Sequence, residues 1–283
     1  MNIFIVENMV VCLCLMGMLF LAGCSSGSSV SSVEIIAHRG ASGSAPENTL
    51  SSAVLAWKKG ADAVEIDVHL TKDNRVVVIH DGSTKRTTGV DLQVRETPSE
   101  ELRKLDAGAF KGQEFVGERI PFLEEIIATI PPRRRLFVEV KCGKEILPVL
   151  DQIITQNGKA SQIVVIGFDL ETMAMSKTLM PHIPTYWLLN CAIDEQTKKP
   201  LPHDMKLIQT AREKGLDGLD VHSAGLTRDF ADAVEAAGLE LYVWTIYSSE
   251  HLRSLQGLKI DGITVDDPAA AREWLGELDV CPN

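Results

Sequence analysis

The segment of residues 62–81 concentrates the side chains best suited to chemistry. Side chains alternate along a strand, so a strand here would point Glu65 and Asp67 to one face. Adjacent carboxylates repel each other and are costly to bury unpaired, whereas divalent cations prefer oxygen ligands. The apolar run that follows ends on His80. The segment therefore offers a metal site beside a histidine. Taken alone, the two carboxylates would be better interpreted as facing solvent on a half-exposed strand, and it is the rest of the chain that favours the metal site.

Further ionisable side chains stand where other predicted strands end. The residues concerned are His38 and Arg39 after the first strand, Glu139 and Lys141 at the third, and Asp266 after the eighth. In a (β/α)8 barrel, catalytic residues lie at the carboxyl ends of the strands. Such a gathering is hard to explain as part of a core, because buried charges need partners.

Strand and helix patterns alternate through the rest of the chain. Strands are predicted at 33–37, 63–68, 136–140, 163–167, 185–189, 218–221, 240–245 and 262–265, with an extra extended piece at 76–80. Helices are predicted at 49–59, 122–130, 144–156, 170–179, 203–214, 228–237, 249–256 and 268–275, the first of them capped by Asn48. Eight βα units in order favour a closed (β/α)8 TIM barrel over an open sheet. The polar, glycine-containing residues 82–120 form an insertion after the second strand, with one short helix predicted at 99–105.

Nine short motifs follow one another in a fixed order between residues 37 and 268. They are AHRG (37–40), APENT (45–49), GADAVEIDVHLTKDN (60–74), VVIHD (77–81), RTT (86–88), IPFLEE (120–125), VEVK (138–141), WT (244–245) and DGITVDDP (261–268). In this order they resemble the glycerophosphodiester phosphodiesterases, over residues 34 to about 275. The resemblance implies a TIM barrel that hydrolyses glycerophosphodiesters to glycerol 3-phosphate and an alcohol, in glycerophospholipid catabolism.

The same resemblance implies roles for individual residues. It gives one divalent cation, Mg²⁺ or Ca²⁺, bound by Glu65, Asp67 and Glu139 with Glu47 nearby, His38 and His80 as the acid/base pair, and Arg39 and Lys141 as phosphate-binding cations. These residue types suit the reaction, because cations stabilise charge on phosphate oxygens and histidines exchange protons near neutral pH. Lys141 could also simply pair with Glu139. Phe168 and Trp244 could be plugs of the barrel or an apolar wall for the substrate.

The N-terminal residues have the pattern of an export signal. Residues 9–23 form an apolar run too short for a comfortable membrane span, and the run leads into Leu21-Ala22-Gly23-Cys24. This resembles a bacterial lipobox, although residues 1–8 contain no Lys or Arg. We expect residues 1–24 to be a lipoprotein signal with lipidation at Cys24, residues 25–32 a linker, and residues 33–278 the catalytic domain. The expected location is the cell envelope, with membrane attachment through the lipid; an uncleaved hydrophobic anchor is the alternative.

The acidic composition of the chain limits the kinds of partner it is expected to bind. A net charge of −11 and a pI near 5.1 argue against nucleic-acid binding, but not against a small anionic substrate that meets local cations. Three cysteines fall in the predicted domain, Cys142, Cys191 and Cys281, and an exported context permits one disulfide of undetermined pairing.

Two other functions stay open: lysophospholipase D or phospholipase D-like action on intact lipid, and a non-catalytic surface binding lipoprotein. The latter would be expected to have lost a histidine or carboxylate of the site, and this chain retains them all.

Overall fold

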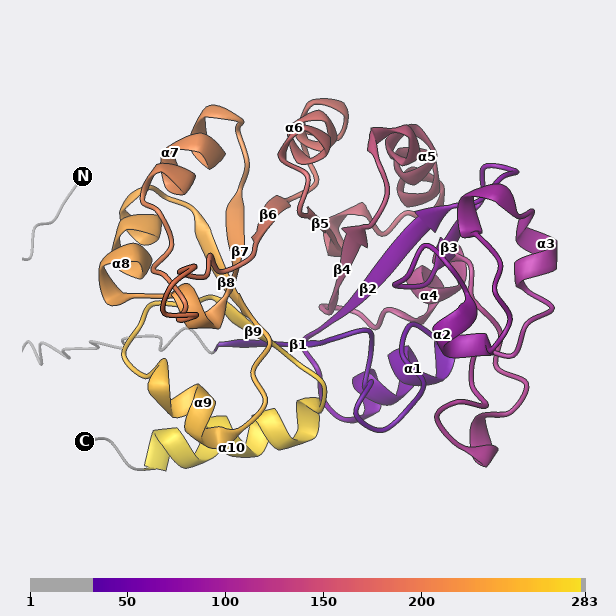
Figure 1. Cartoon of the computed structure of the whole chain (residues 1–283), viewed down its shortest axis with the longest axis horizontal. Helices are drawn as coiled ribbons and strands as arrows, with labels where there is room; N and C mark the ends of the chain where they lie inside the picture. Colours follow the sequence, from indigo (N-terminus) through magenta and orange to yellow (C-terminus); the bar gives the residue numbers. More distant parts are fainter. Residues whose placement is uncertain (1–32, 281–283) are drawn as a thin grey trace, which may run out of the picture. The chain divides into compact units, whose positions relative to one another are not determined.

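The computed structural model describes residues 33–280, which contain a closed barrel of eight parallel strands (Figure 1). The barrel strands are β1 (Glu34–Ala37), β2 (Ala63–Leu70), β4 (Arg135–Val140), β5 (Ile163–Gly167), β6 (Thr185–Leu189), β7 (Gly218–His222), β8 (Glu240–Trp244) and β9 (Gly262–Val265). Strand β1 pairs with β9 on one side and with β2 on the other, and these pairings close the ring. The predicted (β/α)8 TIM barrel is confirmed.

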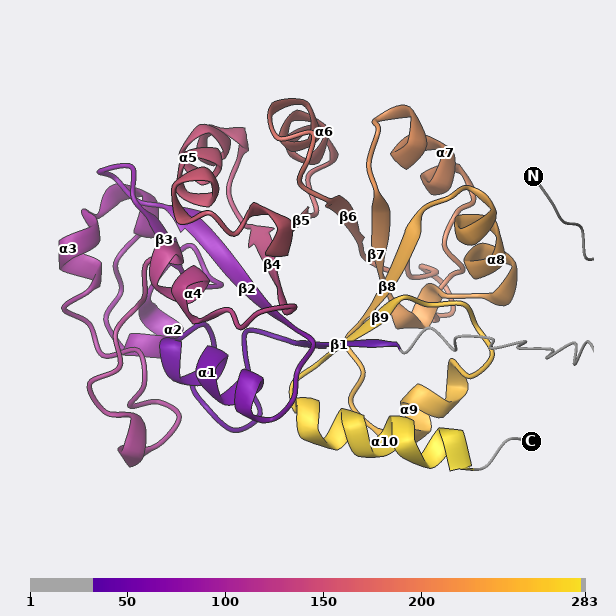
Figure 2. The same ribbon diagram turned by 180° about the vertical axis from the view of Figure 1, so that it is seen from behind.

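Helices flank the ring of strands, as the two opposite views show (Figure 1 and Figure 2). They are α1 (Leu50–Lys58), α4 (Leu123–Thr129), α5 (Leu147–Asn157), α6 (Leu170–Leu179), α7 (Lys206–Glu213), α8 (Arg228–Ala236), α9 (Ser249–Ser254) and α10 (Pro268–Val280). Alternate strand residues such as Ile66, Val165 and Val221 are fully buried in the apolar core shared by strands and helices. Because strand side chains alternate, the residues between them point into the barrel.

The insertion forms a small apolar cluster of its own beside the barrel. Strand β3 (Val76–Val78) pairs antiparallel with β2, and α2 (Lys85–Thr88) and α3 (Ser99–Leu102) follow it. Short 3₁₀ turns occur at Val94–Glu96 and Gln113–Phe115. The cluster consists of buried apolar side chains from β3, the insertion and the residues beside them, namely Val77, Ile79, Val94, Leu102, Ala107, Ile120 and Phe122. The insertion therefore packs on the β2–β3 hairpin through an apolar cluster that is separate from the main core.

The amino-terminal end of the barrel is filled by aromatic and charged side chains. The rings of Tyr186 and Tyr242 stack with centroids 5.1 Å apart, and Phe137 meets Tyr242 edge-on at 5.2 Å. Below them, Arg135 Nε donates to Glu34 Oε1 at 3.0 Å. This filling closes one end of the barrel, so a ligand can enter only from the carboxyl ends of the strands.

Most predicted elements match the structure to within a few residues, and the exceptions have local causes. Thr49, not Asn48, caps α1, because the Thr49 side chain accepts from Ser52 N; Asn48 instead bonds to Asp67. Strand β2 runs on to Leu70, since β3 pairs with its end, and β3 itself stops at Val78. Helix α7 begins at Lys206 instead of residue 203, and α10 continues to Val280.

Several sequence-based expectations concern residues outside this structure. The signal, the linker, the lipidation site Cys24 and Cys281 lie beyond the described residues. Within the described chain, Cys142 and Cys191 are free, so these two thiols are not bonded to each other. Among residues 33–280, no helix combines the length and apolar character required to cross a membrane.

Candidate active site

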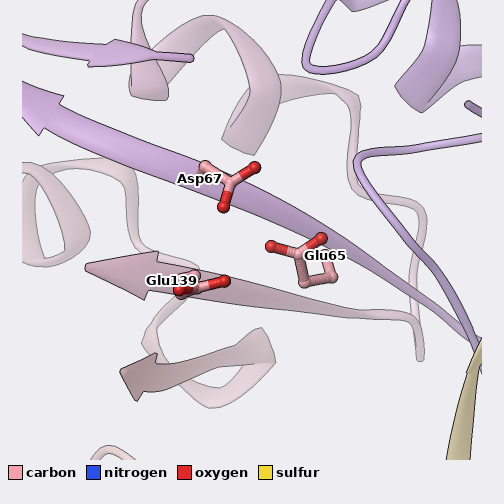
Figure 3. Close-up of side chains that lie close together, drawn as sticks. All are labelled: Glu65, Asp67 and Glu139. Atoms are coloured by element: carbon pink, nitrogen blue, oxygen red, sulfur yellow. The ribbon is translucent and has the colours of Figure 1, made fainter. Parts of the chain in front are cut away.

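Three buried carboxylates converge where two neighbouring strands lie side by side (Figure 3). Glu65 and Asp67 come from β2, and Glu139 comes from β4, where it is paired in register with Asp67. One oxygen from each of the three lies within 4.8 Å of the others, and the residues are only 4%, 1% and 9% exposed. Alternation along β2 places Glu65 and Asp67 on one face, and the parallel pairing of β2 with β4 adds Glu139 beside them.

The electrostatics of this carboxylate cluster favour a bound cation. Burial, and then the charges of Asp67 and Glu139, hold the pKa of Glu65 well above its ordinary value. Burial and Asp67 raise the pKa of Glu139 to about 7. Burial also acts to raise the pKa of Asp67, but Arg39 and Lys141 keep it below the usual value. Glu65 Oε1 and Asp67 Oδ1 are buried without a hydrogen-bond partner in the described chain, and an all-oxygen donor set with two unsatisfied atoms fits Mg²⁺ or Ca²⁺.

Two cationic side chains border the cluster. The Arg39 backbone N donates to Glu65 Oε2 at 2.8 Å, and its guanidinium Nε lies 3.4 Å from Asp67 Oδ2. Lys141 Nζ donates to Glu139 Oε1 at 2.8 Å and lies 3.6 Å from Asp67 Oδ1. The pairing of Lys141 with Glu139 that the sequence suggests is thus present, and both cations still line the cavity.

Both predicted histidines reach the same cavity, and each is oriented by a carboxylate. His38 Nδ1 donates to Asp266 Oδ1 at 2.8 Å, and His80 Nδ1 donates to Asp81 Oδ1 at 2.6 Å. With Nδ1 engaged, Nε2 of each ring is the nitrogen that remains for proton exchange, and in His80 it accepts a hydrogen bond from Lys141. His80 Nε2 lies 3.2 Å from Lys141 Nζ.

Sequence reasoning named Glu47 as a residue near the cation but missed Arg86, which supports the site from the insertion. Arg86 Nη1 donates to Glu47 Oε2 at 2.7 Å and Arg86 Nε donates to Asp81 Oδ2 at 2.7 Å, which ties the insertion to the rim. Glu47 also accepts from Arg39 Nη1 at 2.9 Å. Glu47 therefore touches the two arginines, while the carboxylate cluster consists of the other three acids. The only sequence signal for Arg86 was its place in the RTT motif.

A cavity of about 120 Å³ lies between the polar groups and an apolar wall. Phe168 and Trp244, both predicted as plug or wall, line it and pack edge-to-face with centroids 5.8 Å apart. Ile166 and Leu188 complete the apolar side. One further lining residue, Asp220, has no counterpart in the sequence-based prediction.

A closed (β/α)8 barrel with three carboxylates, two oriented histidines and two cations around one cavity is the arrangement of an enzyme site suited to an anionic substrate. The chain belongs to the glycerophosphoryl diester phosphodiesterase family, whose model matches residues 38–270. The family suggested by the ordered motifs is confirmed.

Individual relatives support this assignment along most of the chain. A Bacillus subtilis (strain 168) protein designated YhdW is 33% identical over 237 residues, which cover 83% of this chain and 94% of YhdW. A glycerophosphodiester phosphodiesterase of Caldanaerobacter subterraneus is 32% identical over 239 residues, covering 83% of this chain and 94% of its own. A solved phosphodiesterase from Oleispira antarctica, in complex with the product sn-glycerol 3-phosphate, is 30% identical with a TM-score of 0.76, covering 86% of this chain and 96% of that chain.

Proposed function

We propose that this chain hydrolyses glycerophosphodiesters to glycerol 3-phosphate and an alcohol, with a divalent cation held by Glu65, Asp67 and Glu139. The observation that carries the proposal is the buried carboxylate cluster with two unsatisfied oxygens, next to two histidines whose Nδ1 atoms are fixed by carboxylates. The product complex of the Oleispira antarctica relative supports the same substrate class.

The charged residues bind and polarise the phosphate in this proposal. A phosphodiester carries one negative charge, and more charge builds up on its non-bridging oxygens as a nucleophile adds. Arg39 and Lys141 would stabilise that charge from the rim, where burial makes each charge more effective than in water. Glu65, Asp67 and Glu139 would hold the cation, which would add positive charge to the site.

The two histidines move the protons. One Nε2 accepts the proton of the attacking hydroxyl while the other histidine, protonated, donates to the leaving alkoxide, so the charges balance in each step. In the route we favour, the glycerol 2-hydroxyl attacks the phosphorus and expels the alcohol, and water then opens the cyclic phosphate. Direct attack by water is the variant. A chromatographic time course distinguishes them, because a complete absence of cyclic glycerophosphate, even in a slowed variant, would remove support for the cyclic route.

The function is tested by measuring glycerol 3-phosphate released from glycerophosphocholine in the presence of Mg²⁺ or Ca²⁺. We expect His38→Ala and His80→Ala each to reduce kcat by about 10²–10⁴-fold, the usual contribution of a positioned acid or base. His182 is exposed on the loop before β6 and provides the matched control, His182→Ala, which should keep wild-type activity. The proposal would be contradicted if the wild-type protein released no glycerol 3-phosphate, or if His38→Ala and His80→Ala both kept full activity.

We also propose the envelope location suggested by the N-terminal motif, with lipid attached at Cys24. The test is incorporation of labelled fatty acid in a bacterial host, compared between the wild-type chain and Cys24→Ser. Labelling that is equal in both would exclude Cys24 as the lipidated residue.

A second substrate class, lysophospholipids, is favoured by apolar side chains in the loops after three barrel strands. Phe168 follows β5, Ile193 follows β6 and Tyr247 follows β8, and they are 38%, 52% and 68% exposed. Such side chains could contact an acyl chain outside the cavity. Release of choline together with lysophosphatidic acid from lysophosphatidylcholine would support this activity, and no release at substrate concentrations that saturate glycerophosphocholine hydrolysis would exclude it.

A further inference from the structure

Asp220 is a buried carboxyl group on the wall of the cavity opposite the carboxylate cluster. It lies in the middle of β7, between Leu219 and Val221, whose side chains are buried in the core outside the ring. Alternation therefore directs Asp220 into the barrel. The residue is 2% exposed and lines the cavity together with the histidines and cations.

No other part of the described chain satisfies this carboxyl group. Asp220 Oδ1 is buried without a hydrogen-bond partner among residues 33–280. Ile166 and Leu188, the apolar residues of the same cavity, offer it no donor. Burial, and then the charge of Glu139, raise the pKa of Asp220 to about 8. A buried carboxyl without a partner destabilises the fold, so its position at a ligand cavity calls for a donor brought by the ligand.

Asp220 lies deeper in the barrel than the aromatic wall. It is in register with Tyr242 on β8, whereas Trp244 stands two residues nearer the carboxyl end of that strand. Trp244 Nε1 also donates to the Asp220 carbonyl oxygen at 3.1 Å. The stacked rings of Tyr186 and Tyr242 close the barrel on the other side. A ligand can therefore contact the Asp220 carboxyl group only with a small part that extends beyond Trp244 into the barrel.

We propose that Asp220 accepts a hydrogen bond from a hydroxyl of the glycerol moiety and thereby selects substrates with a glycerol arm. This inference rests on the proposed function, which places the phosphate at Arg39 and Lys141. A phosphodiester has two arms, and the arm that points to the closed end must be short and must carry a donor. Glycerol meets both conditions, while the other alcohol extends toward the open rim near Phe168.

The alternative ligand group for a carboxylate beside aromatic rings is a quaternary ammonium headgroup. Two observations weigh against it. Asp220 lies two residues below Trp244, toward the end that the Tyr186 and Tyr242 rings fill, and Phe168, not Asp220, is the exposed residue of the wall. A hydroxyl also bonds to a carboxyl oxygen whether or not that group is protonated.

The test compares two phosphate monoesters that differ only in their hydroxyls. Binding of sn-glycerol 3-phosphate and of n-propyl phosphate is measured by calorimetry on the full-length, cation-loaded protein, for wild type, Asp220→Asn and Asp220→Leu. We expect Asp220→Leu to weaken glycerol 3-phosphate binding by about tenfold or more while propyl phosphate binds as well as before. Asp220→Asn keeps one acceptor oxygen, so its affinity for glycerol 3-phosphate should fall between those of the wild type and Asp220→Leu.

Asp232, exposed on the α8 helix that follows β7, gives the matched control. Asp232→Leu should leave both affinities unchanged. Equal weakening of both monoesters by Asp220→Leu would show a merely structural role and overturn the inference. Unchanged glycerol 3-phosphate binding in Asp220→Leu would also overturn it. Phosphocholine is titrated in the same way, and weakened binding of that ligand would then assign Asp220 to the headgroup. Failure of the wild-type protein to bind glycerol 3-phosphate would instead refute the proposed function itself.

Discussion

Replacing Glu139 by glutamine should stabilise the metal-free protein at alkaline pH. Glutamine resembles protonated glutamic acid in shape, so the variant keeps an acceptor for Lys141 and removes the repulsion with Asp67. Burial and that repulsion raise the pKa of Glu139 from 4.5 to about 7 in the folded state. Between these values the folded protein binds more protons than the unfolded chain, so the wild type loses stability as pH rises through this window.

The size of the effect on the free energy of unfolding follows from the pKa shift of Glu139. One pKa unit corresponds to 1.36 kcal/mol, so the ionised Glu139 side chain destabilises the metal-free fold by about 3 kcal/mol at pH 8 and by less than about 1 kcal/mol at pH 5. Glu139→Gln lacks this titration. The gain in free energy of unfolding from the substitution should therefore be about 2 kcal/mol larger at pH 8 than at pH 5.

The assay is urea unfolding in EDTA at the two pH values, with a linear extrapolation to water for each protein. Glu145 is exposed shortly after β4, and Glu145→Gln removes the same charge outside the cluster; it should change stability by less than about 0.5 kcal/mol at either pH. A Glu139→Gln variant that is equally stabilised at both pH values, or is less stable than wild type at pH 8, would refute the proposed repulsion.

Two other substitutions test the supports of the site. Asp266→Asn should leave KM for glycerophosphocholine unchanged and lower kcat by about 10²-fold or more, because the His38 Nδ1 hydrogen would lose its carboxylate acceptor; an unchanged kcat would argue against this positioning role. Gly40→Ala should destabilise the protein by more than Gly60→Ala, in urea unfolding. Both glycines have a left-handed φ, +79° and +82°, but only at Gly40 would the added Cβ collide with a neighbour, Ser52. Equal losses would contradict this packing argument.

The elements of the barrel could be predicted well because their signals are local. The strands at 163–167, 185–189 and 262–265 are short apolar runs bounded by turn residues, and the structure has them with those bounds. The bounds were less accurate where pairing partners decide them. Strand β2 continues to Leu70 only because β3 folds back on it, and this contact is not visible in the run of residues itself.

The same distinction holds for the site. Alternation placed Glu65 and Asp67 on one strand face, the family resemblance added Glu139, and the structure brings the three together. Asp81, Asp266 and Arg86 support other residues through contacts made only in the folded chain, so residue type and spacing gave no indication of their partners. Asp220 resembles any aspartate in a short strand until its burial and its missing partner are seen.

The measurement that tests the central claim most directly is the cation dependence of glycerol 3-phosphate release. Protein stripped with EDTA is assayed on glycerophosphocholine during titration with Mg²⁺ and, separately, Ca²⁺, beside Glu65→Gln treated in the same way. We predict that the stripped wild type is inactive, that one of the two cations restores its activity, and that the variant stays inactive at the same cation concentrations. Full activity of the stripped protein, or equal restoration of Glu65→Gln, would contradict the assignment of the buried carboxylates as the cation site of a phosphodiesterase.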